Sequence, residues 1–201
     1  MRSIRWSAAI ASVLVSSLVM VGQVQAQTPL HISAGPTLGT ISSDDFPDSE
    51  SSIGFFAALG TSLEVGESVA ISPYLGYVQK GAEFDGESAS YDYIEIPVFI
   101  STWFPVGENM SWSIFAGPAI GFQINCDEGG FDCTEFTNHK STEFGVLAGT
   151  GLQFPGGFSV GVGADIGMTD LFDELDYKTR TFWLSLGYTA WLGGTPNGNR
   201  M

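Results

Sequence analysis

Apolar residues alternate with small or polar residues along most of the chain. In the stretch 158–168 the apolar side chains share one face, and the opposite face holds only glycine, serine and Asp165. Successive side chains of a β-strand point to opposite faces, so this period of two predicts strands. No segment after residue 26 has the period of an amphipathic helix. The alternation predicts strands at residues 30–40, 53–65, 69–80, 91–104, 111–124, 141–154, 158–168 and 180–192.

The tiny residues on the second face favour a closed transmembrane barrel over a soluble sandwich, because the inward positions of a narrow barrel must fit a small circumference. The predicted lengths match or slightly exceed the roughly 9 to 11 residues with which a tilted strand crosses a bilayer. We therefore predict an all-β fold, an eight-stranded antiparallel up-and-down transmembrane β-barrel with a filled lumen and no open porin channel. A secreted, soluble lipocalin-like ligand binder is an alternative.

The connections between the predicted strands alternate in length. Those at 66–67, 105–110 and 155–157 are short, whereas those at 41–52, 81–90, 125–140 and 169–179 are long. Outer-membrane barrels have short periplasmic turns and long external loops, so all four long connections are expected on the outer side.

The first 26 residues have the pattern of an export signal. Arg2 and Arg5 precede an apolar run from about Ala8 to Val21, and small residues end the segment at Ala26. The apolar run is shorter than the roughly 18 residues of a spanning helix. We therefore predict a cleaved signal peptide at 1–26 and a barrel domain at 27–201.

The mature chain is strongly acidic. Removing residues 1–26 takes away two of the seven basic residues and none of the 22 acidic ones, which leaves a net charge of −17. Nucleic acid is excluded as a partner because its approach meets net repulsion. Sixteen carboxylates lie in or beside the long connections. Eight of them, in the first and fourth long connections, are candidate ligands of divalent cations: Asp44, Asp45, Asp48, Glu50, Asp170, Asp173, Glu174 and Asp176.

These loops do not have the spacing of an EF-hand, so no particular metal is identified. The other interpretation is a solvated acidic surface. We expect the lipid bilayer as a partner and lipopolysaccharide, bridged by divalent cations, as a candidate one. The chain is expected to be monomeric and to need no cofactor, and no protein partner is identified.

Two cysteines, Cys126 and Cys133, are predicted to form a disulfide, since export places them in an oxidising compartment. A zinc site would need two more ligands nearby. A ring this short stabilises the fold by roughly 2 to 3 kcal/mol in the chain-entropy model.

Three charged residues, Lys80, Glu95 and Asp165, fall on the small-residue faces of their predicted strands. A buried charge requires a partner. We expect these residues in the lumen, with Lys80 as a candidate partner of Glu95 in a structural pair rather than in proton chemistry.

Four prolines interrupt the predicted strands. Each removes one donor from a ladder that has no free edge, so bulges are expected at these sites. The sequence Gly-Pro-x-Leu/Ile-Gly occurs twice, at 35–39 and 117–121. The four are Pro36, Pro73, Pro97 and Pro118.

An outer-leaflet hydrolase is a second hypothesis. His139 lies near Ser141 and Glu143, which together could form a Ser-His-Glu set at the outer rim, as in lipid A-modifying barrels. The alternation of side chains along a strand would stretch this set along one row. We therefore expect these three residues to be ordinary polar residues where the third long connection joins the barrel, and we expect no enzyme activity.

The segment Tyr91-Asp-Tyr-Ile-Glu-Ile-Pro-Val-Phe-Ile100 resembles a strand of PorT-like outer-membrane β-barrel proteins, and Ala116 to Gly121 resembles the strand that follows it in that family. The resemblance implies an eight-stranded barrel in a Gram-negative outer membrane without an assigned activity. The sequence thus predicts an outer-membrane protein with a structural or surface-binding role through acidic external loops.

Overall fold

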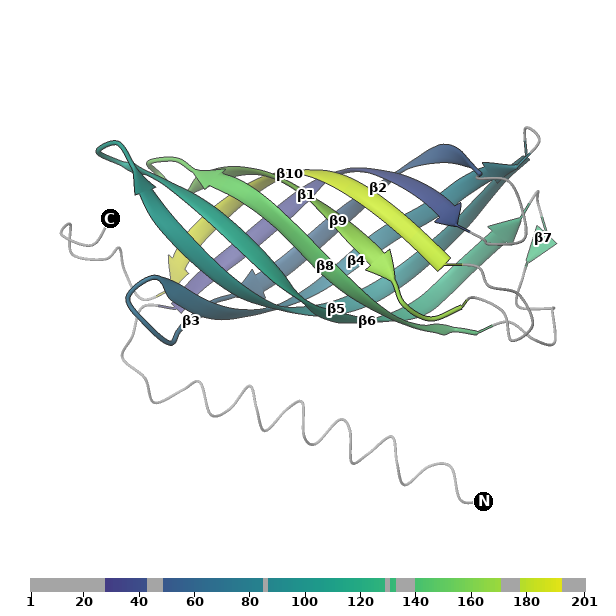
Figure 1. Cartoon of the computed structure of the whole chain (residues 1–201), viewed down its shortest axis with the longest axis horizontal. Coiled ribbons are helices and arrows are strands. Elements are labelled where there is room, and N and C mark those ends of the chain that lie inside the picture. Colours follow the sequence, from purple (N-terminus) through teal and green to yellow (C-terminus); the bar gives the residue numbers. More distant parts are fainter. Residues whose placement is uncertain are drawn as a thin grey trace, which may run out of the picture.

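The computed structural model describes residues 28–42, 49–84, 87–128, 131–132, 140–170 and 178–192. These residues form one curved sheet (Figure 1). Within them, no helix is long and apolar enough to cross a membrane. The predicted signal peptide, 1–26, lies outside the described residues.

Eight long strands build the sheet, and two short ones extend it. β3 continues β2 beyond Ser62, and β7 pairs with the end of β6. The strands are β1 (Thr28–Ser42), β2 (Glu50–Thr61), β3 (Leu63–Glu64), β4 (Val69–Phe84), β5 (Glu87–Val106), β6 (Met110–Glu128), β7 (Phe131–Asp132), β8 (Thr142–Gln153), β9 (Phe158–Gly167) and β10 (Lys178–Leu192).

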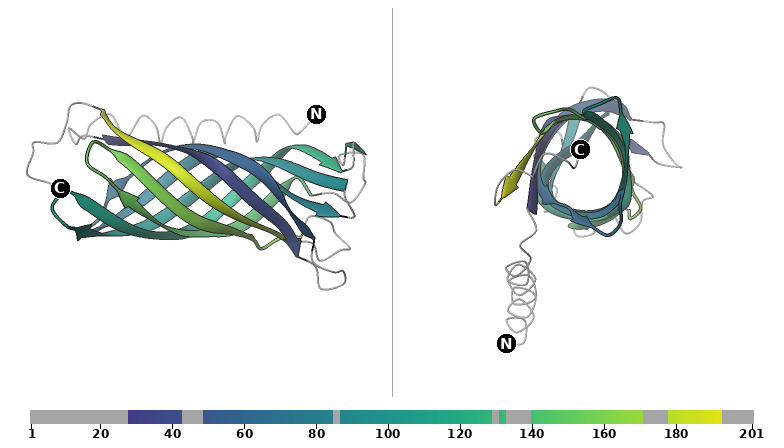
Figure 2. Two further views of the ribbon diagram at one scale, coloured as in Figure 1. Left: turned by 90° about the horizontal axis from the view of Figure 1, so that it is seen from above. Right: turned by 90° about the vertical axis from the view of Figure 1, so that its left-hand side faces the viewer.

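The sheet closes on itself. Every long strand is antiparallel to its neighbours in sequence, and β1 pairs with β10 from Thr28↔Leu192 to Ser42↔Lys178. Seen along its axis the ribbon is a closed ring (Figure 2). Closure gives the edge strands a partner, as a bilayer requires of any sheet that spans it. The predicted eight-stranded antiparallel barrel is confirmed.

The two ends of the barrel differ. At one end, called the turn end here, short connections join β3 to β4, β5 to β6 and β8 to β9, and both Thr28 and Leu192 lie there. Gly107, Gly156 and Gly157 have positive φ in these tight turns. The other end, called the loop end, carries the connections from β1 to β2, β4 to β5, β6 to β8 and β9 to β10. The long connection predicted at 81–90 is wrong, because β4 and β5 stay paired as far as Phe84↔Glu87. In outer-membrane barrels the turn end faces the periplasm.

The outward face is apolar, as the alternation predicts. Ile53, Leu186 and Phe158 are more than 60% exposed and so face the bilayer. Thr61, the one polar member of its row, donates a hydrogen bond from its hydroxyl to the Pro29 carbonyl, 2.8 Å away.

Inward glycines make room for aromatic rings on neighbouring strands. A Cβ atom at Gly60 would overlap the ring of Tyr74, and one at Gly163 would overlap the indole of Trp183. The small residues are therefore one half of cross-strand pairs whose other half is a large ring.

The prolines do not produce the predicted bulges. Pairing of β1 with β10 is interrupted at Pro36, yet Ala34↔Leu186 and Thr37↔Trp183 keep one register. The register of β6 with β8 likewise runs through Pro118↔Val146. The register shifts lie elsewhere, between Ser51 and Phe56 and between Asp92 and Tyr93.

The repeated Gly-Pro step explains why no bulge is needed. A Cβ atom at Gly35 would overlap the carbonyl oxygen of Leu184, and one at Gly117 would overlap that of Val98. Glycine lets the adjacent strand pass close by where proline lacks a donor, so the pairs at the glycine and the proline are lost on one side while the register is kept.

Candidate functional site in the barrel lumen

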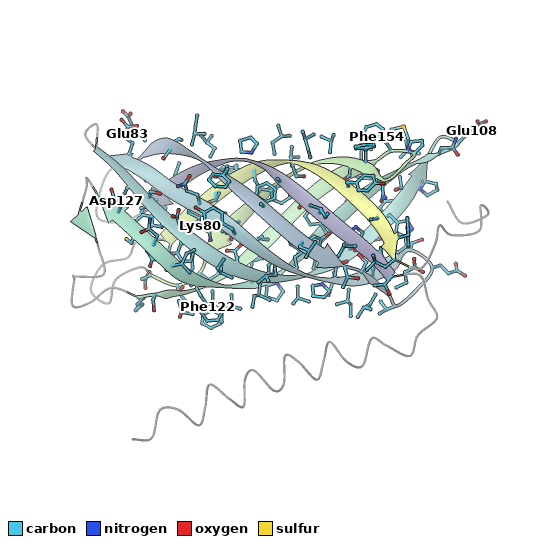
Figure 3. The ribbon with its side chains drawn as sticks, turned by 180° about the vertical axis from the view of Figure 1, so that it is seen from behind. Lys80, Glu83, Glu108, Phe122, Asp127 and Phe154 are labelled. Carbon is cyan, nitrogen blue, oxygen red and sulfur yellow. The ribbon has the colours of Figure 1, made fainter. Side chains whose placement is uncertain are left out.

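One lysine and three carboxylates meet inside the barrel. Lys80 Nζ lies 3.0 Å from Glu95 Oε1, 3.1 Å from Glu143 Oε2 and 2.5 Å from Asp165 Oδ2. All four side chains are buried. Figure 3 shows Lys80 within the barrel, nearer to Glu83 and Asp127 at the loop end than to Glu108 at the turn end. We call these four residues the Lys80 cluster.

The cluster joins strands that are not neighbours. Lys80 is on β4 and Glu95 on the adjacent β5, whereas Glu143 is on β8 and Asp165 on β9, with β6 between the two pairs. The period of two turns each of these side chains inward, and the lysine reaches across the narrow lumen to the second pair.

Further groups support the cluster. The Thr179 hydroxyl of β10 donates to Glu143 Oε1. Lys80 Nζ also lies 5.2 Å from the centre of the Tyr93 ring, within the range of a cation–π contact. Burial lowers the effective dielectric, so each of these attractions is stronger than it would be in water.

The charges of the cluster do not cancel. Three carboxylates surround one ammonium, which leaves two more negative than positive groups if all are ionised. A buried charge without compensation is costly. The cluster therefore attracts protons or a further cation.

The lumen on the loop side of the cluster is packed with side chains. Tyr91 and Tyr93 are 1% and 0% exposed, and they belong to one hydrophobic cluster with Ile41, Val78 and Cys126. Because β1, β4, β5 and β6 all supply side chains to this cluster, the loop half of the lumen is filled.

The lumen on the turn side is open. A cavity of about 1070 Å³ is lined by inward residues of the turn half and reaches the turns themselves, at Gly107 and Gly157. Glu95 and Asp165 of the Lys80 cluster form part of its inner end. The expectation of a filled lumen is thus wrong for this half, where serine and glycine occupy inward positions.

Aromatic rings follow one another around the cavity wall. Phe99 and Phe115 are 5.1 Å apart, and Phe115 stacks on Trp183 at 5.8 Å with an angle of 12°. At one end Phe99 contacts Tyr74, which stacks on His31, and at the other end Trp183 contacts Phe56. These six rings, called the aromatic row here, are His31, Tyr74, Phe99, Phe115, Trp183 and Phe56.

His31 is fixed in this row by hydrogen bonds. Its Nδ1 atom lies 3.0 Å from the Thr189 hydroxyl, and its Nε2 atom lies 2.8 Å from the Ser62 hydroxyl, which in turn lies 2.8 Å from the Ser72 hydroxyl. Both ring nitrogens are therefore engaged in a structural network.

The acidic residues predicted to bind divalent cations are only partly within the described residues. Glu50 is exposed at the start of β2, and Asp170 Oδ1 lies 3.5 Å from Lys178 Nζ. No group of three potential metal ligands forms among the described parts of the chain. The remaining six, Asp44, Asp45, Asp48, Asp173, Glu174 and Asp176, lie outside the described residues.

The predicted disulfide and the predicted hydrolase set both involve residues beyond the described ones. Cys126 is buried on β6, while Cys133 lies outside the described residues, so the disulfide stays a prediction. His139 also lies outside. Ser141 is exposed, but Glu143 is buried and bonded to Lys80 and Thr179 rather than placed at the rim.

Glu143 is the member of the Lys80 cluster that the sequence-based prediction missed. It was expected to be an ordinary polar residue at the outer rim, where the third long connection joins the barrel. However, it shares its face with Gly145, Gly149 and Gly151, the small residues that mark an inward row. The rule that places Lys80, Glu95 and Asp165 inside the barrel therefore also places Glu143 there.

Comparisons with known proteins place this architecture among barrels of the outer membrane. A family model described as outer membrane protein beta-barrel domain matches residues 25–173. No curated protein sequence matches the chain.

Solved structures with a similar fold are outer-membrane barrels of low sequence identity. Neisserial surface protein A (NspA) has a TM-score of 0.53 and 11% identity over 79% of this chain and 96% of its own. The outer membrane enzyme PagL has a TM-score of 0.52 and 20% identity over 79% of this chain and 98% of its own. Ail, the attachment invasion locus protein of Yersinia pestis, has a TM-score of 0.46 and 17% identity over 82% of this chain and 100% of its own. At these identities the likeness shows the fold alone.

Proposed function

Because the chain belongs to the outer membrane protein β-barrel domain family, we propose that it is a closed, non-conducting barrel that acts at the outer surface through its acidic loop end. Membership of this family confirms the expected outer-membrane localisation. The finer resemblance to PorT-like proteins remains part of the proposal, and no role in secretion is inferred from it.

The observation that supports a closed barrel is the packed loop half of the lumen. Tyr91, Tyr93 and Lys80 are almost completely buried on the paired strands β4 and β5. Lys80 reaches across the lumen to Glu143 of β8 and Asp165 of β9. An eight-stranded barrel has an interior just wide enough for side chains to fill. A solute entering from the turn end therefore meets a closed wall at the Lys80 cluster.

The surface that remains for interactions is acidic. Among the described residues of the loop end, Glu50 and Asp127 are exposed, and the connections beyond them add further carboxylates. A surface of one sign raises the local concentration of oppositely charged partners. We propose cationic partners: basic protein segments, or divalent cations that bridge to lipopolysaccharide. The barrel acts as a monomer and needs no cofactor.

Conductance tests the closed barrel. Purified protein inserted in a planar lipid bilayer should give no current steps above the background, whereas a general porin inserted in the same way should. Regular open-channel steps from the unaltered protein would contradict the closed barrel and leave the acidic surface as a separate question.

A charge-matched pair of variants tests the acidic surface. The triple variant Asp44→Asn, Asp45→Asn, Asp48→Asn removes three charges from the first long loop. Glu64→Gln, Glu67→Gln, Glu108→Gln removes three exposed charges from the turn end. Binding of decalysine to the protein in zwitterionic nanodiscs is measured by calorimetry, and a parallel titration uses Ca²⁺ alone.

The loop variant should bind decalysine roughly tenfold more weakly than the unaltered protein, since exposed pairs contribute roughly 0.2 to 1 kcal/mol each. The turn variant should bind within about twofold of it. Equal weakening by both variants, or no binding by the unaltered protein, would contradict a role for the loop end.

The proposal includes no catalysis, because Glu143 is committed to Lys80 and Thr179 and is not available to orient a histidine at the rim. The His139→Ala variant tests this directly. Mass spectrometry of lipid A from cells that express the variant should match that from cells that express the unaltered protein. A lipid A change made by the unaltered protein and lost in the variant would reinstate the hydrolase.

A further inference from the structure

The inner end of the lumen cavity carries two buried oxygen atoms with no hydrogen-bond partner. Asp165 is 2% exposed and Thr181 is 1% exposed, and both line the cavity. They face each other as register partners on β9 and β10. Asp165 Oδ1 and Thr181 Oγ1 have no partner among the described residues. Buried polar atoms are normally satisfied, so this pair calls for a donor that enters from the cavity.

The charge at this point selects the kind of donor. Asp165 and Glu95 both line the cavity and both contact Lys80, whose single ammonium group faces three carboxylates. A ligand with one positive charge reduces the excess of negative charge, whereas a neutral ligand leaves it and an anion increases it. A charge-assisted bond to a carboxylate is also the stronger kind of hydrogen bond.

The walls next to this point are aromatic. Phe56, Phe115 and Trp183 line the cavity and contact one another in sequence. Aromatic faces attract ammonium groups and also pack against apolar groups. The cavity continues from there to the turns, so its mouth is on the periplasmic side.

We propose that this cavity binds a small organic cation that enters from the turn end. Its primary ammonium group donates hydrogen bonds to Asp165 and Thr181, and its apolar or aromatic body lies against the aromatic row. A metal ion is the weaker candidate, since Lys80 Nζ already occupies the space between the carboxylates and no metal-ligand group forms among the described residues. The site is separate from the acidic loop end.

The first experiment uses the unaltered protein in zwitterionic nanodiscs and three probes of similar shape. These are the 2-phenylethylammonium ion, neutral 2-phenylethanol and the anion 3-phenylpropanoate, with empty nanodiscs as the background in calorimetry. The ammonium ion should bind at least about tenfold more tightly than the alcohol, because hydrogen bonds to charged groups are the stronger class. The anion should not bind. Equal binding of ammonium ion and alcohol would overturn the proposal and indicate that protons already neutralise the cluster.

The second experiment locates the site with a matched pair of variants. Asp165→Asn removes one charge at the inner end of the cavity, and Asp170→Asn removes one charge outside it, at the loop end. Binding of 2-phenylethylammonium should weaken at least about tenfold in the first variant and stay within about twofold in the second. Thr181→Val should give a smaller loss, since it removes a neutral acceptor only.

A filling variant keeps the test valid if Asp165→Asn does not fold, as judged by heat-modifiable migration on a gel. Ser185→Phe places a ring in the cavity without changing its charge, and Ser185 lines the cavity in the turn half. Binding of the ammonium ion should be lost in this variant. Unchanged binding in Ser185→Phe, or in a folded Asp165→Asn, would overturn the proposal whatever the loop variants show with decalysine.

Discussion

The two halves of the lumen differ although the same eight strands line both. In the loop half, Tyr91, Tyr93 and Lys80 fill the interior and are almost fully buried. In the turn half, inward serines and glycines such as Ser185 and Gly161 leave a cavity of about 1070 Å³. An eight-stranded barrel is therefore neither filled nor hollow by virtue of its strand number. The side-chain sizes at each level decide, and the Lys80 cluster marks the boundary.

The largest expected effect comes from removing the cation at that boundary. Lys80→Met leaves three buried carboxylates without their shared partner, which should lower the free energy of unfolding by about 3 to 5 kcal/mol. Urea unfolding in lipid vesicles, followed by tryptophan fluorescence, measures the change. Lys178→Met is the control, because Lys178 and Asp170 are more than a third exposed and 3.5 Å apart. Equal effects of the two variants would show that the cluster does not hold the lumen together.

The difference in packing should appear when the same bulk is added to each half. Ala82 is 0% exposed in the loop half, so Ala82→Leu overpacks its surroundings and should destabilise the protein by about 1 to 3 kcal/mol. Ser185→Leu adds bulk that the cavity can accommodate and should cost less than about 1 kcal/mol. Unfolding midpoints in urea test both. A larger loss for Ser185→Leu would mean that the cavity closes in the membrane.

The glycine–aromatic pairs offer a test in the turn half itself. A Cβ atom at Gly60 would meet the ring of Tyr74 and nothing nearer, so Gly60→Ala should cost about 1 to 2 kcal/mol. The cost should shrink in a Tyr74→Leu background, which gives a coupling of about 1 kcal/mol in a double-mutant cycle. Gly66→Ala serves as the control, since the nearest atom to its Cβ is 3.8 Å away. Additive effects of Gly60→Ala and Tyr74→Leu would refute the pairing.

The strands themselves could be predicted because the face to which a side chain points depends only on whether its position along the strand is odd or even. The row Phe158, Val160 and Val162 is outward in the structure, and the alternate row of glycines is inward, as the alternation indicates. At the loop end the strands extend further than predicted. β5 begins at Glu87 and β6 ends at Glu128, so charged residues continue the pairing beyond the apolar segment. The alternation of apolar residues marks only the part of a strand that crosses the bilayer. Backbone hydrogen bonding between the strands continues beyond that part, so the prediction ends the strands too early.

Contacts across the lumen could not be predicted from parity. Whether Lys80 lies level with Glu95, Glu143 or Asp165 depends on the stagger between strands, which accumulates around the barrel and is set by closure. The cavity was missed for the same reason, since the level of each inward side chain was unknown. The bulges predicted at Pro36 and Pro118 were wrong because the preceding glycines, Gly35 and Gly117, allow a close approach that keeps the register.

The smallest expected effect separates buried from exposed charge. Asp170→Asn removes the partner of Lys178 at the exposed loop end and should change the free energy of unfolding by at most about 1 kcal/mol. Ions in solution screen exposed pairs within about 8 Å at physiological ionic strength but reach buried ones much less. Raising the salt concentration should therefore abolish the small effect of Asp170→Asn and leave that of Lys80→Met intact, as urea titrations at low and high sodium chloride would show. If salt also erased the effect of Lys80→Met, water and ions would have to reach the cluster, and the packed loop half could not be the wall that closes the barrel.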